Sequence, residues 1–176
     1  KLKEDLEKCT MCPHKCGVNR YKNVGFCKAE SNIKIGLIST HEFEEPCISY
    51  KNGSGTIFFS NCNLRCKFCH NPEMWQMKES NYTSSEIVDK VLRNKPYFKN
   101  NGGVTFSGGE PLLQYDFLLE TCKKLKKENI HIAIDTAGIG LGDYKELFDT
   151  IDLVLLDIKH ITKEGYMDIT CRDYLE

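Results

Sequence analysis

A short run of mostly β-branched and aromatic residues, Thr56–Ser60 (TIFFS), leads into the segment Cys62–Asn71, which reads CNLRCKFCHN. The composition of the first run predicts a buried strand. Cys62, Cys66 and Cys69 follow it with the spacing C-x3-C-x2-C. Three thiolates can hold three corners of a cubane iron–sulfur cluster, for which four thiolates are the usual complement. One iron then stays open to another ligand, so the spacing indicates a reaction centre rather than an electron store alone.

From Gly55 onward, apolar runs alternate with segments of helical periodicity. Besides Thr56–Ser60, the sequence predicts strands at Gly103–Ser107, Ile130–Asp135 and Leu153–Ile158. It predicts helices after the capping box Thr83–Glu86, over Tyr115–Glu128 and over Tyr144–Phe148. Strands that alternate with helices favour a parallel sheet with right-handed crossovers. The predicted fold class is therefore α/β, and each chemical motif falls at the C-terminal end of a strand.

Four motifs follow one another in the chain: CNLRCKFCHNPE from Cys62, GGVTFSGGEP from Gly102, DTAG from Asp135 and LLDIK from Leu155. Together they resemble the activating enzymes of glycyl-radical enzymes, of the pyruvate formate-lyase activase type, in the radical S-adenosylmethionine (SAM) superfamily. The resemblance implies an open six-strand partial (β/α) barrel, of which this chain supplies about four strands. We expect a Cys-rich segment over residues 1–50 and a partial barrel over residues 51–176 that lacks its C-terminal part.

The resemblance implies a radical SAM oxidoreductase with a [4Fe–4S] cluster on Cys62, Cys66 and Cys69. The resemblance further implies that SAM binds the open iron and that one electron from the reduced cluster cleaves SAM to a 5′-deoxyadenosyl radical. The radical then installs a glycyl radical on a partner enzyme, with electrons from a flavodoxin- or ferredoxin-type donor. Two alternatives stay open: a radical SAM enzyme with another substrate, and a non-catalytic iron–sulfur or zinc electron-transfer module.

The resemblance also assigns residues to the SAM site. Those expected near the SAM adenosine are Phe68, His70 and Asn71, and those expected near its ammonium group are Gly108, Gly109 and Glu110. Those expected to bind a monovalent cation and the SAM carboxylate are Asp135, Thr136, Asp157 and Lys159, and Lys159 joins the three cysteines as a catalytic residue. For each group a purely structural role stays open. Phe68 is then a core aromatic, His70 a solvent-facing loop histidine, and Gly108 with Gly109 a Gly-rich turn. Asp157 and Lys159 are then a structural ion pair.

A second set of cysteines precedes the barrel, with the spacing Cys9-x2-Cys12-x3-Cys16-x10-Cys27. Four thiolates can hold a second [4Fe–4S] cluster or a structural Zn²⁺. Soft ligands beside a redox centre favour iron–sulfur. Clustered cysteines suit metal ligation in a reducing compartment better than disulfides. The remaining three, Cys47, Cys122 and Cys171, are interpreted as ordinary thiols, with Cys122 in the core.

The chain has 176 residues, enough for one domain with a real core, and a formal net charge of −1. This charge gives no basic footprint for nucleic acid. No apolar run approaches the roughly 18 residues that span a bilayer, and the polar start Lys1–Asp5 is not a signal peptide. We expect a cytoplasmic protein of anaerobic metabolism with no membrane and no nucleic-acid partner.

Overall fold

The computed structural model describes residues 6–41, 46–49, 54–75, 81–98 and 102–172. They form a five-stranded sheet of order β1-β2-β3-β4-β5. The strands are β1 (Ile35–His41), β2 (Ser54–Phe59), β3 (Gly103–Gly108), β4 (His131–Thr136) and β5 (Leu153–Leu156). β1 is antiparallel to β2, and β2 to β5 are parallel. Because neighbouring parallel strands follow in chain order, the sheet has the topology of a partial (β/α) barrel.

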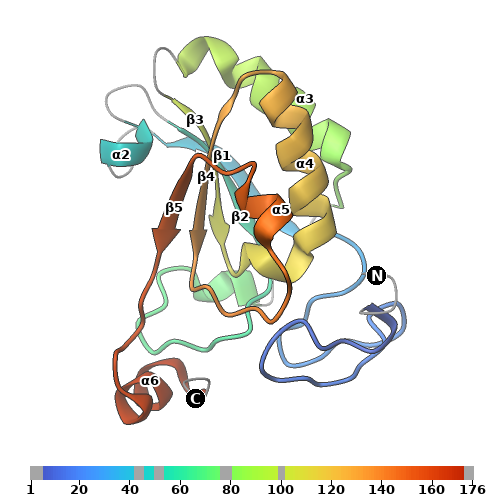
Figure 1. The fold of residues 1–176 in the computed structure, drawn as a ribbon, viewed down its shortest axis with the longest axis vertical. Helices are drawn as coiled ribbons and strands as arrows, with labels where there is room; N and C mark the ends of the chain where they lie inside the picture. Colours follow the sequence, from blue (N-terminus) through green and yellow to red (C-terminus); the bar gives the residue numbers. More distant parts are fainter. Residues whose placement is uncertain (1–5, 42–45, 50–53, 76–80, 99–101, 173–176) are drawn as a thin grey trace.

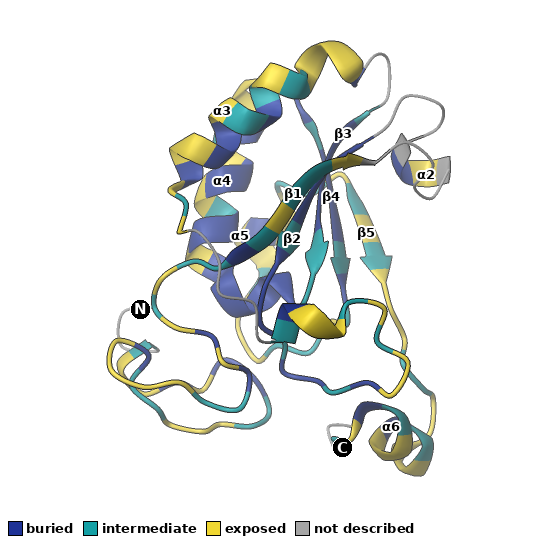
Figure 2. Cartoon of the chain, turned by 180° about the vertical axis from the view of Figure 1, so that it is seen from behind, coloured by how far each residue is buried: buried dark blue, intermediate teal, exposed yellow. Residues whose placement is uncertain are grey.

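The longer helices lie on one side of the sheet in both views (Figures 1 and 2). They are α3 (Ser84–Asn94) and α4 (Tyr115–Lys127), followed by the short α5 (Lys145–Phe148). α6 (Lys163–Thr170) lies beyond the end to which the parallel strands point, and α2 (Pro46–Ser49) lies near the opposite end (Figure 1). Three short 3-10 helices complete the chain: η1 (Pro72–Trp75), η2 (Lys95–Tyr97) and η3 (Pro111–Gln114). No helix in the described residues is both long enough and apolar enough to cross a bilayer.

Alternation along the strands separates the two faces of the sheet. Every second residue of the central strands belongs to the main buried cluster: Ile57, Phe59, Val104, Phe106, Ile132 and Ile134. α3 and α4 supply apolar partners, which include Ile87, Val91, Leu118 and Leu125. Among the intervening residues, Thr56, Thr105 and Ala133 are direct partners across the sheet. Since alternate strand residues face opposite sides, these three small side chains lie on the face away from the helices.

The structure confirms the predicted α/β class and the four parallel strands. It also confirms the capping box that begins α3: the Glu86 N–H donates to the Thr83 hydroxyl at 3.2 Å, and the Thr83 N–H donates to the Glu86 carboxylate at 2.7 Å. Cys122 is fully buried on α4, as predicted, and burial raises the pKa of its thiol to about 12. All ten cysteines are free thiols.

The strand β1 and the helix α6 are absent from the sequence-based prediction, as are the four-residue helix α2 and the three short 3-10 helices. In β1 the register shifts between Ile35 and Leu37, and this irregularity puts Ile35 in the core while Leu37 stays 46% exposed, so the period-two signal is lost. β1 lies within residues 1–50, so the sheet extends across the boundary expected there. α6 is short and contains Gly165, whose N–H donates to the capping Thr162 hydroxyl at 3.2 Å.

Candidate functional site

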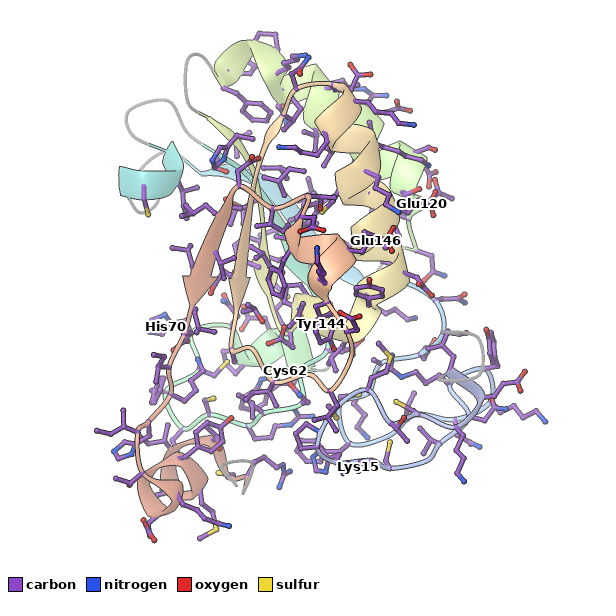
Figure 3. All side chains as sticks on the ribbon, viewed as in Figure 1. Lys15, Cys62, His70, Glu120, Tyr144 and Glu146 are labelled. Carbon is purple, nitrogen blue, oxygen red and sulfur yellow. The ribbon has the colours of Figure 1, made fainter. Side chains whose placement is uncertain are left out.

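A pocket with a volume of about 150 Å³ opens where the parallel strands end. The loop after β2 supplies one wall, and the ends of β3, β4 and β5 supply the others. All three cysteines Cys62, Cys66 and Cys69 line it, together with Phe68, His70, Asn71, Gly108, Gly109, Asp135, Thr136, Asp157 and Lys159. Cys62 and His70 lie at this end of the sheet in Figure 3. The pocket therefore gathers every residue predicted for the SAM site except Glu110.

The thiols in this pocket are poor nucleophiles in their protonated form, because the thiolate is the reactive species. Burial raises the pKa of the Cys62 thiol to about 12, and the charge of Glu110 adds to this effect. Burial also raises the pKa of Cys66, although the Lys159 ammonium opposes the shift. The Leu64 N–H points to the Cys62 Sγ at 3.4 Å. Because metal binding displaces the thiol proton, such groups fit metal or cluster ligands better than free nucleophiles.

The cysteine loop is held from the side of α6. The Arg65 N–H donates to the Thr170 carbonyl at 3.1 Å, and the Lys67 N–H donates to the Ile169 carbonyl at 2.9 Å. The Arg65 side chain also donates to the Cys62 carbonyl at 2.7 Å. These bonds fix the backbone around Cys66, so segments distant in sequence set the positions of the thiols.

The two glycines of the Gly-Gly-Glu motif are required by the packing of β3 against β2. A Cβ atom on Gly109 would lie 2.1 Å from the Asn61 carbonyl oxygen. Gly108 has a φ of +100°, and a Cβ atom there would lie 2.6 Å from the Phe59 carbonyl oxygen. The Gly109 N–H donates to that same Phe59 carbonyl at 2.7 Å. Both glycines also line the pocket, so the structural reason for glycine and the predicted SAM contact are compatible.

Glu110 is buried behind the pocket, with only 1% of its surface exposed. Its Oε1 accepts from the Thr136 hydroxyl at 2.6 Å and from the Leu112 N–H at 3.1 Å, and its Oε2 accepts from the Ala137 N–H at 3.0 Å. Burial raises the pKa of its carboxyl to about 7 in spite of these donors. Glu110 thus ties the end of β3 to the end of β4, and its contact with the SAM ammonium stays a prediction.

Two carboxylates and one ammonium share the pocket. The Ser107 hydroxyl donates to Asp135 Oδ2 at 2.8 Å, and Lys159 forms an ion pair with Asp157. Burial raises the pKa of Asp135, and the Asp157 charge adds to the shift. Burial lowers the pKa of Lys159, but the hydrogen bond to Asp157 and its charge outweigh burial and raise it. The Lys159 ammonium also lies 5.5 Å from the centre of the Phe68 ring.

The residues predicted to lie near the SAM adenosine occupy the open rim of the pocket. Phe68 is 48% exposed, so the alternative of a core aromatic is wrong. His70 is exposed and Asn71 is half-buried, and both line the pocket. The rim therefore offers an aromatic face and polar groups to a bound molecule.

The N-terminal cysteines are close to one another. Cys9, Cys12 and Cys27 are buried, whereas Cys16 is exposed. Burial raises the pKa of the Cys9 thiol, and Cys16 and Cys27 raise it further. Burial also raises the pKa of Cys12, with added effects of Cys27 and Cys9. Cys9 is therefore within electrostatic range of each of the other three thiols.

A buried arginine accompanies this set. Arg20 is 3% exposed, donates to the Leu113 carbonyl at 2.8 Å and lies 3.8 Å from the Cys27 Sγ through Nη2. Its charge lowers the pKa of Cys9 against the effect of burial. In the part of the chain that the structure describes, no carboxylate pairs with Arg20. Since a buried charge needs a counter-charge, Arg20 fits a cluster of thiolates.

The two cysteine sets are neighbours. The segment Cys62–Asn71, which carries the first cysteine set, is called the cluster loop. The Asn63 side chain hydrogen-bonds to the Cys12 thiol, although Asn63 directly follows Cys62 in this loop. Arg65, from the same loop, donates to the Phe26 carbonyl at 2.9 Å. Among the described residues, no three His, Cys, Asp or Glu side chains are gathered closely enough for a single metal ion. The metals expected at both sets therefore stay predictions.

Sequence reasoning missed several residues around the site. Ser107 orients Asp135, and its place directly before the Gly-Gly-Glu motif was the available signal. Arg20 and Tyr166 are buried beside the two cysteine sets, and nothing local in the sequence marks either one.

A parallel partial barrel with a C-x3-C-x2-C loop after its first parallel strand defines the class of fold and site. The model of the radical SAM superfamily matches residues 56–176, and the chain belongs to this superfamily. It is 53% identical over 116 residues to a pyruvate formate-lyase-activating enzyme of Clostridium pasteurianum. This match covers 65% of this chain and 49% of the relative. With the same coverage, it is 43% and 41% identical over 124 residues to enzymes of that name from Staphylococcus epidermidis and Staphylococcus aureus. The chain spans about half the length of the curated relatives it matches.

Glu110 should make stability depend on pH. Because its pKa rises from 4.5 in the unfolded chain to about 7 in the fold, its contribution is full below pH 4.5 and is lost as the pH rises through 7. The shift corresponds to a loss of about 3 kcal/mol in the free energy of unfolding. Urea denaturation between pH 4.5 and 7.5 should show this slope in the wild type and not in Glu110→Gln. Glu120→Gln, on the surface of α4, should keep it, and equal slopes in all three proteins would contradict the assignment.

Proposed function

We propose that this protein is a glycyl-radical activating enzyme, which reductively cleaves SAM and uses the resulting radical to install a glycyl radical on a partner enzyme. The observation that carries the proposal is the pocket in which three thiols of one loop meet two carboxylates and an ammonium at the strand ends. The names of the relatives support the choice of an activating enzyme over other radical SAM activities.

The donor set fits the cofactors that the superfamily implies. Cys62, Cys66 and Cys69 supply the three thiolates of a [4Fe–4S] cluster with one open iron. When bound there, the cluster and SAM supply the one-electron cleavage that yields a 5′-deoxyadenosyl radical. The protein's task is to hold these groups, orient them and keep water away from the radical.

Lys159 and the two carboxylates have separate tasks in this proposal. Lys159 is a point charge for the SAM carboxylate. Asp135 and Asp157 offer hard oxygen ligands for a monovalent cation, with Thr136 beside them. The backbone at Gly108 and Gly109 is bare enough for close approach of the methionine moiety. These groups orient the SAM sulfonium toward the cysteine loop.

The rim binds the other half of SAM. The exposed face of Phe68 offers a stacking surface, and His70 and Asn71 offer hydrogen bonds to the adenosine.

We propose a second metal centre on Cys9, Cys12, Cys16 and Cys27, either a [4Fe–4S] cluster or Zn²⁺. The mutual electrostatic effects of the thiols and the buried Arg20 support it, because four thiolates carry a charge that a guanidinium offsets. The direct contact of Asn63 with Cys12 favours the redox-active form, since it joins this set to the cluster loop. A flavodoxin- or ferredoxin-type protein is the proposed electron donor. The free thiols support a reducing compartment, the cytoplasm.

Replacing Cys66 with Ala should abolish SAM cleavage, because two thiolates cannot hold the cluster with its open iron. The protein is reconstituted anaerobically with iron and sulfide, reduced with dithionite and supplied with SAM, and deoxyadenosine is measured. Cys122→Ala removes a buried thiol of the α4 core and should keep the activity. Full cleavage by Cys66→Ala would show the cluster assignment to be wrong. Cleavage without a glycyl radical on any glycyl-radical partner would favour the alternative of another substrate.

Asp157→Asn should weaken SAM binding and slow cleavage while leaving the melting temperature nearly unchanged. The substitution keeps the size of the side chain and removes its charge. Asp157 is half exposed in its ion pair, and such pairs contribute little to stability. Asp149→Asn, which removes the charge of an exposed ion pair with Lys145 away from the pocket, is the matched control. An early-melting Asp157→Asn protein with normal turnover would leave the structural ion pair as the explanation.

Cys12→Ala should remove the metal of the N-terminal set and leave the cluster on Cys62, Cys66 and Cys69. Iron and zinc contents after reconstitution, together with the electron paramagnetic resonance (EPR) signal on adding SAM, separate the two sites. Cys47→Ala, an exposed thiol outside both sets, is the control. Loss of the SAM-responsive signal with no other metal change would mean that both sets share one centre.

A further inference from the structure

Tyr166 of α6 carries a buried hydroxyl that has no hydrogen-bond partner among the residues that the structure describes. The residue is 3% exposed, and its hydroxyl oxygen contacts no solvent. A buried polar group without a partner costs about 1–3 kcal/mol, so natural structures nearly always supply one. The hydroxyl therefore indicates a hydrogen-bond acceptor at this place.

The surroundings of Tyr166 are the thiols of the cluster loop. It forms one buried cluster with Leu64 and Cys66, against which Cys62 and Cys69 also pack. After burial, the strongest effects that raise the pKa of its phenol come from Cys66 and then Cys62. Tyr166 therefore lies in the same buried cluster as Cys66 and within electrostatic range of Cys62.

Two carboxylates also lie within electrostatic range of the phenol. Glu110 and Asp157 raise the pKa of Tyr166, but less than the two cysteines do. The oxygens of Glu110 already receive three hydrogen bonds, and Asp157 pairs with Lys159. The sulfurs of Cys66 and Cys62 are therefore the groups with the strongest influence on the phenol.

The position of Tyr166 is fixed by the same contacts that hold the loop. The Thr170 hydroxyl donates to the Tyr166 carbonyl at 2.7 Å, and the Thr170 and Ile169 carbonyls accept from the loop N–H groups of Arg65 and Lys67. These hydrogen bonds therefore join the backbone of α6, which carries Tyr166, to the backbone of the loop that carries the thiols.

We infer that Tyr166 donates its O–H to a sulfur of the cluster held by Cys62, Cys66 and Cys69, and that this hydrogen bond raises the reduction potential of the cluster. The inference rests on the cluster site proposed above. Reduction adds negative charge to the sulfurs, so a donor stabilises the reduced form more than the oxidised one. Tyr166 is a positioning and tuning residue that makes electron delivery to the cluster easier.

Tyr166→Phe tests this inference, because it keeps the ring and removes only the hydroxyl. The ratio of reduced to oxidised cluster at a fixed potential should fall about tenfold, which for a one-electron couple is a 59 mV more negative midpoint. An anaerobic redox titration followed by EPR measures it. The Fe–S stretching frequencies in resonance Raman spectra should change as well, independently of activity.

The matched control is Tyr115→Phe, which removes the hydroxyl of a buried tyrosine on α4 whose electrostatic neighbours include no cysteine. Its midpoint potential should equal that of the wild type. If Tyr166→Phe retains too little cluster to titrate, Tyr166→Met fills the space without a donor and should give the same shift. An unchanged potential and unchanged Fe–S frequencies in the Tyr166 variant overturn the inference. A cluster that persists in Cys66→Ala overturns the proposed site instead, and the two failures are distinguishable.

Discussion

The ends of β2 and β3 approach each other too closely for any side chain to fit between them. At Gly109 even a methyl group would collide with the Asn61 carbonyl oxygen, at 2.1 Å. This contact places the loop that begins at Cys62 directly against the Gly108–Glu110 segment. Glu110 then continues the connection to β4 through Thr136 and the Ala137 N–H. Close packing of the backbone after β2 against the backbone after β3 therefore forms this side of the pocket and limits the movement of the side chains that it carries.

The charges of the pocket follow from the alternation of the strands. Ser107 and Asp135 point to the face away from the helices, because their neighbours Phe106 and Ile134 fill the core. Asp135 is partly buried, and burial and the Asp157 charge raise its pKa together. The Lys159 ammonium offsets this repulsion. A sheet whose other face is apolar therefore gathers the charged groups Asp135, Asp157 and Lys159 at the end where the parallel strands stop, where a charged ligand can use them.

The sequence predicted the parts of the site that depend on local pattern. Three cysteines after a strand, two glycines after a strand and Asp157 with Lys159 after a strand could be placed at one edge, since parallel strands end together. Glu110 was predicted as a ligand contact, and its hydrogen bonds across to β4 could not be foreseen, because they depend on the packing of three strands. β1 was missed because a bulge removes its alternation. The neighbourhood of Tyr166 depends on how α6 docks, which no local pattern encodes.

The N-terminal segment, the cluster loop and the C-terminal region meet at one aromatic ring. The Arg65 guanidinium lies 4.3 Å from the centre of the Phe26 ring, and the Arg172 guanidinium lies 3.5 Å from it. Phe26 directly precedes Cys27 of the second cysteine set, and Arg65 directly precedes Cys66 of the first. The cysteines that precede the barrel in sequence are therefore adjacent in space to the loop that carries Cys62, Cys66 and Cys69. A displacement of either segment must move Arg65, so the geometry of both cysteine sets is coupled through this contact.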